Sequence, residues 1–206
     1  PGRARAPPSI ASYLQRFTAG FTASLAHDMS SPSSSRKLPN ILIVGTPGTG
    51  KSTTAQYVVQ GAPSMRHVEV GALVREKQLH TGWDAEYECH VLDEDRILDE
   101  LEEGMEAGGV IVDFHGADLF PERWFDLVVV LRTDNSVLYS RLQSRNYSQK
   151  KLTENVEAEI MQVILDEARE SYAEEIVLEL SSDTLEALEA NVQRILQFIA
   201  AFKPAA

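Results

Sequence analysis

Eight consecutive residues carry the clearest chemical signal in this sequence. Residues 45–52 read GTPGTGKS and match the pattern G-x-x-x-x-G-K-[ST] at every fixed position. Glycines let the backbone turn tightly and approach an anion, and successive amide N–H groups then form a concave nest of donors for phosphate. In this pattern Lys51 reaches the β- and γ-phosphates of a nucleotide, and the Ser52 hydroxyl binds Mg²⁺.

The residues on either side of this loop support the same interpretation. An apolar run at 41–44 precedes it, and a run typical of a helix, 52–60, follows it. The loop would therefore join a buried strand to a helix N-terminus, whose free amides and positive dipole end attract anions. A chance glycine-rich turn is the alternative, and the agreement between motif and context argues against it.

A carboxylate and an imidazole follow a second apolar run, at 110–112. Asp113 is a candidate for the acid that contacts Mg²⁺ through water, the role of the strand-end aspartate in P-loop enzymes. An ordinary strand-end or helix-cap aspartate is the alternative. His115 lies two residues further on, and as a neutral imidazole it would orient a water or a substrate hydroxyl. A purely structural histidine is the other interpretation.

Three arginines are candidates for contacts with phosphate. Arg141 and Arg145 fall at the end of an expected helix and in the polar, basic loop beyond it. Guanidinium groups pair bidentately with phosphate oxygens and neutralise charge during phosphoryl transfer, although a solvated basic loop is equally consistent with the sequence. Arg75 lies in acidic surroundings, where a salt bridge would also account for it.

Strands and helices alternate along the chain. We expect strands at 41–44, 66–70, 110–113, 126–131 and 175–180, and helices at 52–60, 71–78, 93–106, 135–142, 152–172 and 185–202. This alternation predicts an α/β fold with a parallel sheet covered by helices on both faces. Ligands of such folds bind beyond the carboxyl ends of the strands, where Lys51 and Asp113 would both lie.

Composition limits the class of protein. The chain has 206 residues, of which 43% are hydrophobic and 24% charged, as in one ordinary globular domain. No apolar run approaches the roughly 20 residues of a membrane span. The net charge of −12 argues against direct, sequence-independent binding of nucleic acid. It fits a basic protein partner, or it serves only to keep the protein in solution.

Residues 1–38 differ from the rest of the chain. They are rich in proline, alanine, serine and arginine, and carry a net charge of +4 against −16 for the remainder. We expect this segment to be a disordered N-terminal extension, followed by a folded domain at 39–206. An organelle transit peptide and an upstream extension before Met29 are the alternatives.

Five further segments are VEVGALVRE at 68–76, LDEDR at 92–96, GVIVDFHG at 109–116, FPERWF at 120–125 and VLRTD at 130–134. The Asp-aromatic-His-Gly element at 113–116 and FPERWF are not generic features of P-loop proteins. Together with the glycine-rich loop the five segments resemble adenylate kinase isoenzyme 6, a family also called coilin-interacting nuclear ATPase protein. The resemblance covers about residues 39–202.

This resemblance implies a P-loop nucleoside monophosphate kinase fold with a central five-stranded parallel sheet. It implies an AMP-binding segment at about residues 69–92 and a short lid at about 144–154. The implied reaction transfers the γ-phosphoryl group of ATP to AMP or another nucleoside monophosphate with Mg²⁺, alongside an intrinsic ATPase. The resemblance also implies a role in maturation of the small ribosomal subunit, through binding one of its proteins, in the nucleus and cytoplasm.

The resemblance also assigns roles by position. The phosphates of ATP would be held by Gly48, Thr49, Gly50, Lys51, Ser52, Thr53, Arg141 and Arg145, and the acceptor nucleotide by Gly71 and Arg75. Catalysis would depend on Lys51, Asp113, His115 and Arg145. Mg²⁺ would be bound by Ser52 and, through water, by Asp113.

Two positions depart from the family pattern. Ala72 stands where the family commonly has aspartate, which bears on the affinity for the acceptor. Asn146 stands where the lid usually has glycine. Because asparagine tolerates a left-handed backbone better than most residues, we expect the shape of the lid loop to be kept.

Overall fold

The computed structural model describes residues 36–84 and 89–204, which belong to the second of two units of the chain, 34–206. The expected disordered extension therefore lies outside the described residues, except for 36–38. Within the described ranges, no helix combines the length and the apolar content that crossing a membrane requires.

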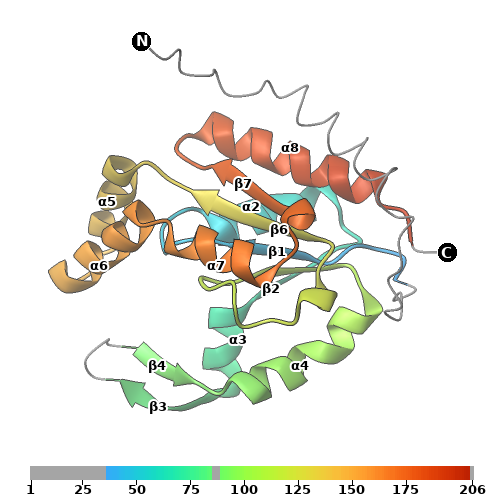
Figure 1. The fold of residues 1–206 in the computed structure, drawn as a ribbon, viewed down its shortest axis with the longest axis horizontal. Helices are drawn as coiled ribbons and strands as arrows, with labels where there is room; N and C mark the ends of the chain where they lie inside the picture. The colour runs from blue at the N-terminus through green and yellow to red at the C-terminus, as the bar shows by residue number, and fades with distance from the viewer. Residues whose placement is uncertain (1–35, 85–88, 205–206) are drawn as a thin grey trace. The chain divides into compact units, whose positions relative to one another are not determined.

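Five parallel strands form the central sheet, as the sequence predicts (Figure 1). Their order is β2-β5-β1-β6-β7, and every neighbouring pair runs parallel. The strands are β1 (Ile41–Val44), β2 (Arg66–Glu69), β5 (Val110–Asp113), β6 (Leu127–Arg132) and β7 (Val177–Ser181).

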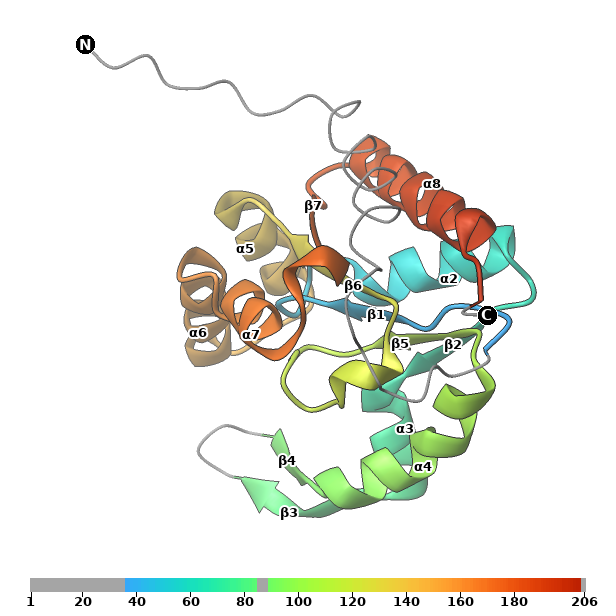
Figure 2. The same cartoon turned by 45° about the vertical axis from the view of Figure 1, so that its right-hand side comes forward.

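Helices cover both faces of this sheet. The α-helices of the described residues are α2 (Lys51–Gly61), α3 (Val70–Lys77), α4 (Glu94–Ala107), α5 (Asn135–Ser144), α6 (Gln149–Ile160), α7 (Val163–Ser171) and α8 (Leu185–Ala201), of which α5 and α6 pack on each other. Helices α2 and α8 lie together on one face (Figures 1 and 2), whereas α3, α4 and α7 contribute to the hydrophobic core on the other. The α/β fold class is therefore confirmed.

The central strand β1 is apolar at every position because both of its faces are covered. Successive side chains of a strand point to opposite faces of the sheet. Leu42 and Val44 belong to the core on the α4 and α7 side, and the remaining residues Ile41 and Ile43 are also fully buried. A strand that is covered on both faces has no solvent-facing position left for a polar side chain.

The segment after α3 forms a hairpin that the sequence did not predict as such. β3 (His80–Asp84) and β4 (Cys89–Leu92) pair antiparallel in a separate two-stranded sheet. The strands are short and mix polar with aromatic residues, so they lack the regular alternation that identifies a half-buried strand.

The expectation of one helix at 152–172 is wrong. α6 ends at Ile160 and α7 begins at Val163, and between them Gln162 adopts a left-handed backbone conformation with φ 60°. The carbonyl of Glu159 accepts hydrogen bonds from Arg132 Nη2 (2.8 Å) and from the Gln162 amide (3.2 Å). These contacts replace the i to i+4 ladder of the helix, and hydrophobic periodicity cannot detect them because it continues across the break.

At the edge of the sheet where β1 begins, Asn40 joins three segments. Its side-chain amide donates to the carbonyls of Met105 (2.7 Å) and Trp124 (3.0 Å), and its Oδ1 accepts from the Val110 amide (3.1 Å). Arg36, the first described residue, is buried beside it, and its guanidinium bonds the Trp124 carbonyl (3.0 Å). The packed part of the chain thus includes a residue upstream of 39.

We predict that Asn40→Ala lowers the free energy of unfolding by about 3 kcal/mol, because it removes the partner of three buried backbone groups. Asn155 provides a matched control, since among the described residues its amide bonds the Lys151 carbonyl of its own helix (2.6 Å), and Asn155→Ala should cost less than about 1 kcal/mol. Urea unfolding measures both changes. Equal losses for the two variants would contradict the assigned role of Asn40.

Candidate active site

The order of the sheet brings the candidate residues to one edge. β1 lies between β5 and β6, so the chain leaves β1 toward one side of the sheet and later returns to the other. Such a switch point opens a crevice at the carboxyl ends of the strands. Ile43 of β1 is in register with Asp113 of β5, which places the glycine-rich loop beside this carboxylate.

Three glycines of the loop, Gly45, Gly48 and Gly50, have backbone conformations that other residues adopt only with strain. Gly45 has φ 146°, and a Cβ there would lie 2.5 Å from the Leu131 carbonyl oxygen, so the loop packs directly on the end of β6. Gly50 is the N-cap of α2 with φ 93° and makes no side-chain cap. The first amides of α2 have no partners within the helix, as an anion-binding helix N-terminus requires.

The carbonyl of Thr46 organises the interior of the loop. It accepts hydrogen bonds from the Thr49 amide (3.2 Å), the Thr49 hydroxyl (2.9 Å) and Lys51 Nζ (3.2 Å). The Thr49 side chain is thus turned into the loop, and any contact of this residue with phosphate is left to its backbone. Ser52 and Thr53 lie in the first turn of α2, half-buried and exposed respectively.

Within residues 36–84 and 89–204, no carboxylate forms an ion pair with Lys51. Burial lowers its pKa to about 8, the carboxylates of Asp113, Glu159 and Glu69 act in the opposite sense, and the positive charge of Arg145 adds to the lowering. A desolvated cation beside a second cation is strongly favoured by an incoming anion. The electrostatics therefore fit a phosphate site between Lys51 and Arg145.

Asp113 is 3% exposed, and among the described residues its Oδ2 has no hydrogen-bond partner. His67 of the neighbouring strand β2 places an equally unpaired Nε2 3.4 Å away. His67 was missed because its side chain comes near Asp113 only once β2 pairs with β5, where His67 lies in register with Ile111.

Mg²⁺ fits this arrangement. It keeps several waters and takes few protein ligands alongside substrate phosphates, and the unpaired Oδ2 of Asp113 can accept a hydrogen bond from a metal-bound water. Within the described part of the chain, no three histidine, cysteine or acidic side chains gather into a metal cage. Ser52 and Asp113 would hold the ion, which would neutralise charge on the transferred phosphoryl group.

His115 lies on the border of a cavity of about 220 Å³. Loss of hydration chiefly, and then the nearby positive charge of Lys51, lower its pKa, so the ring is neutral near pH 7. Its ring packs on Phe114 with centroids 4.2 Å apart. The cavity is also bordered by carboxylates of Glu94, Asp118 and Glu167.

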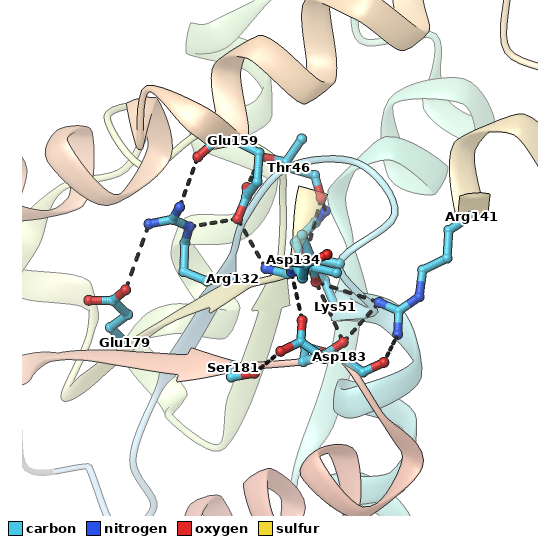
Figure 3. A network of polar contacts seen from close by, with 12 residues as sticks. Thr46, Lys51, Arg132, Asp134, Arg141, Glu159, Glu179, Ser181 and Asp183 are labelled. Atoms are coloured by element: carbon cyan, nitrogen blue, oxygen red, sulfur yellow. Dashed lines mark hydrogen bonds and ion pairs between the residues drawn. The ribbon is translucent and has the colours of Figure 1, made fainter. Parts of the chain in front are cut away.

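The candidate arginines Arg141 and Arg145 have different environments. Arg141 donates to the carbonyls of Gly48 (3.3 Å), Ser182 (2.9 Å) and Asp183 (2.9 Å), so it braces the loop against the end of β7 (Figure 3). Arg145 is exposed at the C-cap of α5, close enough to Lys51 to affect its pKa.

The acceptor candidates lie on α3. Arg75 is exposed and forms an ion pair with Glu69 (3.6 Å), and Gly71 lies beside it, since a Cβ there would be 3.6 Å from the Arg75 guanidinium. A salt bridge is thus present, with Glu69 as its partner. In the lid loop Asn146 has φ 57°, the left-handed conformation that the sequence analysis expects it to tolerate.

Glu159 is the other residue that the sequence analysis missed. It is 2% exposed, and its carboxylate accepts hydrogen bonds from Thr46 and Arg132 (Figure 3). One signal was present: counting from Leu152 and Val156, Glu159 falls on the inward-facing stripe of α6. A carboxylate at an apolar position of an amphipathic helix indicates a buried partner.

Comparison with known proteins places this site in a family. A model of the AAA domain matches residues 41–162. The adenylate kinase isoenzyme 6 homolog of Dictyostelium discoideum is 56% identical over 164 residues, which cover 80% of this chain and 93% of the relative. The homolog of the same name from Caenorhabditis elegans is 52% identical over 170 residues, covering 82% and 93%.

Solved structures support the fold. Shikimate kinase from Acinetobacter baumannii superposes with a TM-score of 0.57 at 18% identity, covering 81% of this chain and 95% of that one. The Deinococcus radiodurans tunicamycin resistance protein superposes with a TM-score of 0.55 at 20% identity, covering 82% and 99%. The fold is thus that of the P-loop kinases, and by sequence the chain belongs to the adenylate kinase isoenzyme 6 family.

Proposed function

We propose that this protein transfers the γ-phosphoryl group of ATP to AMP or a related nucleoside monophosphate, with Mg²⁺, and that it also hydrolyses ATP. The observation that carries the proposal is the convergence of Lys51, the uncapped N-terminus of α2 and the buried Asp113 at one edge of the sheet. The membership of the family and the kinase fold support a nucleotide kinase-like function.

In this proposal the residues bind the phosphates of ATP and neutralise the negative charge of the transferred phosphoryl group. The phosphates lie on the glycine-rich loop, where Lys51 contacts them, and Ser52 and, through water, Asp113 would hold the metal ion. Arg145 approaches from the proposed lid at residues 144–154. Because phosphoryl transfer needs little covalent chemistry from the protein, positioning and electrostatic stabilisation supply most of the rate enhancement.

The acceptor lies on the other side of Asp113. Arg75 and Gly71 of α3 belong to the proposed AMP-binding segment at 69–92, which also contains the β3–β4 hairpin. Arg75 exchanges its exposed contact with Glu69 for the acceptor phosphate. An exposed ion pair contributes only about 0–1 kcal/mol, so this exchange costs little.

His115 supports hydrolysis in the absence of an acceptor. A neutral imidazole can accept a proton, and its lowered pKa keeps it neutral near pH 7. It lies two residues after Asp113 on the cavity border, where it orients a water for attack on the terminal phosphate.

A second function uses the same site as an ATP-driven switch. Here the protein binds a basic protein of the small ribosomal subunit during its maturation, in the nucleus and cytoplasm, and AMP phosphorylation is incidental. The net charge of −12 and the three carboxylates around the His115 cavity favour such a partner, since acidic surfaces attract basic ones.

The primary test measures ADP formed from ATP with AMP present, and phosphate released without it. The kinase function predicts fast, AMP-dependent ADP formation. We expect Lys51→Ala to lower both rates by about 100-fold or more, because a cation at the transferred phosphoryl group is lost. Lys37→Ala, which removes an exposed lysine from the start of the domain, is the control and should leave both rates unchanged. Full activity in Lys51→Ala would exclude the proposed site.

The lowered pKa of Lys51 predicts that ATP binding takes up a proton at high pH. In the free protein the pKa is about 8, and the phosphates raise it in the complex. Below this value Lys51 is charged in both states, whereas at about pH 9 the free side chain is mostly neutral and binding requires its protonation. The ATP Kd should therefore rise as pH increases through the free-protein pKa.

Calorimetry without divalent cations, in two buffers that differ in ionisation enthalpy, measures this uptake. We expect up to one proton per ATP at about pH 9 and less near pH 7.5. Lys51→Arg is the control, because a guanidinium stays charged throughout. An unchanged uptake in this variant would assign the proton to another group.

The second function makes a separate prediction. A basic small-subunit ribosomal protein should bind at physiological salt and change the rate of phosphate release, with affinity that falls as salt screens the charges. Substitution of Glu94, Asp118 and Glu167 together by glutamine should weaken binding by about tenfold or more, because complementary charge is lost. Absence of binding by the 206-residue chain would remove this function for it.

A further inference from the structure

Glu159 is a buried carboxylate that the proposed mechanism does not use. It lies in the last turn of α6, and only 2% of its surface is exposed. Taking an ionised carboxylate out of water is expensive unless it is paired and hydrogen-bonded. The partners of Glu159 must therefore compensate for the cost of burying its charge.

Three donors converge on this carboxylate, and they come from two other segments (Figure 3). The Thr46 hydroxyl donates to Oε2 (2.5 Å), and Arg132 Nε (2.6 Å) and the Thr133 amide (3.0 Å) donate to Oε1. Arg132 also bonds the Glu159 carbonyl (2.8 Å). Glu159 thus joins the glycine-rich loop, the end of β6 and the end of α6 through charge-assisted bonds.

The bond to Thr46 has a consequence inside the glycine-rich loop. Thr46 itself is 2% exposed, and its carbonyl is the acceptor for Lys51 Nζ and for both donors of Thr49. The hydrogen bond between the Thr46 hydroxyl and Glu159 restrains residue 46. It thereby also restricts the direction in which the Thr46 carbonyl points. Glu159 is therefore linked to Lys51 through Thr46, which bonds both side chains.

The same carboxylate also anchors the proposed lid. α5 and α6 pack against each other through Leu138, Leu142 and Leu152, and the turn between them carries Arg145. Glu159 fastens the far end of α6 to the loop that carries Lys51. One carboxylate is thus linked to both cations of the proposed phosphate site.

We propose that Glu159 is a positioning residue for the phosphate donor, which acts through Thr46 to set the glycine-rich loop and through α6 to hold the lid against it. This inference rests on the proposed function, since it takes ATP as the ligand of the loop. In this role, Glu159 and Thr46 affect ATP binding through the same hydrogen bond. Their substitutions should therefore be non-additive.

The test measures the ATP Kd of the full chain by calorimetry with Mg²⁺, together with thermal unfolding. Thr46→Val removes the hydroxyl at nearly constant shape, and Glu159→Gln removes the charge. We expect each to weaken ATP binding by about tenfold and the double variant to lose no more than about tenfold, as coupled residues do. Thr46→Ser, which keeps the hydroxyl that Thr46→Val lacks, should retain most of the wild-type affinity for ATP.

Asp126→Asn is the matched control. Asp126 pairs with the buried Arg36 (3.1 Å) at the opposite edge of the sheet, so this variant also changes a carboxylate of a buried ion pair to an amide. It should lower the melting temperature and leave the ATP Kd within about twofold, since it is far from the loop.

Three outcomes would overturn the inference: ATP Kd values within about twofold of wild type in Thr46→Val and Glu159→Gln, an additive loss in the double variant, or no recovery in Thr46→Ser. If Glu159→Gln does not fold, the two Thr46 variants decide the matter, because they leave the pair with Arg132 intact. Failure of the wild-type chain to bind ATP would instead refute the proposed function.

Discussion

Parallel pairing of β1 with β5 on one side and β6 on the other determines where chemistry can occur in this protein. Parallel strands end at the same edge, so the glycine-rich loop after β1 and Asp113 at the end of β5 must meet. The close approach of Gly45 to the Leu131 carbonyl shows how tightly the loop is set on this edge. The backbone donors of the loop are then held in place before any ligand arrives, and such preorganisation lowers the cost of binding an anion.

Among the described residues, Lys51 has no carboxylate in direct contact at the place where phosphate would bind. Lys51 donates to a carbonyl, and its nearest carboxylates act only at a distance. Glu159, the carboxylate nearest to the base of the loop, is committed to Arg132 and Thr46. A desolvated lysine beside an already neutralised carboxylate remains available to phosphate, whereas a direct ion pair would compete with the ligand.

The acidic residues around the His115 cavity have a different character. Glu94, Asp118 and Glu167 border this cavity, and their carboxylates, where ionised, repel anions and attract basic groups. The phosphate-binding loop and this cavity therefore present opposite electrostatic preferences within one region of the molecule. This contrast would let the loop bind an anionic nucleotide while the border of the His115 cavity binds a basic partner.

The amino-acid sequence by itself determined the fold class, the five strands and the phosphate-binding loop, because these depend on local patterns: apolar runs of strand length, glycine spacing and alternation with helices. It also indicated Asp113 and His115, which lie at the end of a strand and just beyond it. Only the tertiary structure decided which side chains face one another across segments. The contact of His67 with Asp113, the anchoring of Arg141 on backbone carbonyls and the break after Glu159 all arise between residues far apart in the chain. Sequence periodicity reports which face of an element is buried, but it carries no information on the partner that satisfies a buried polar group.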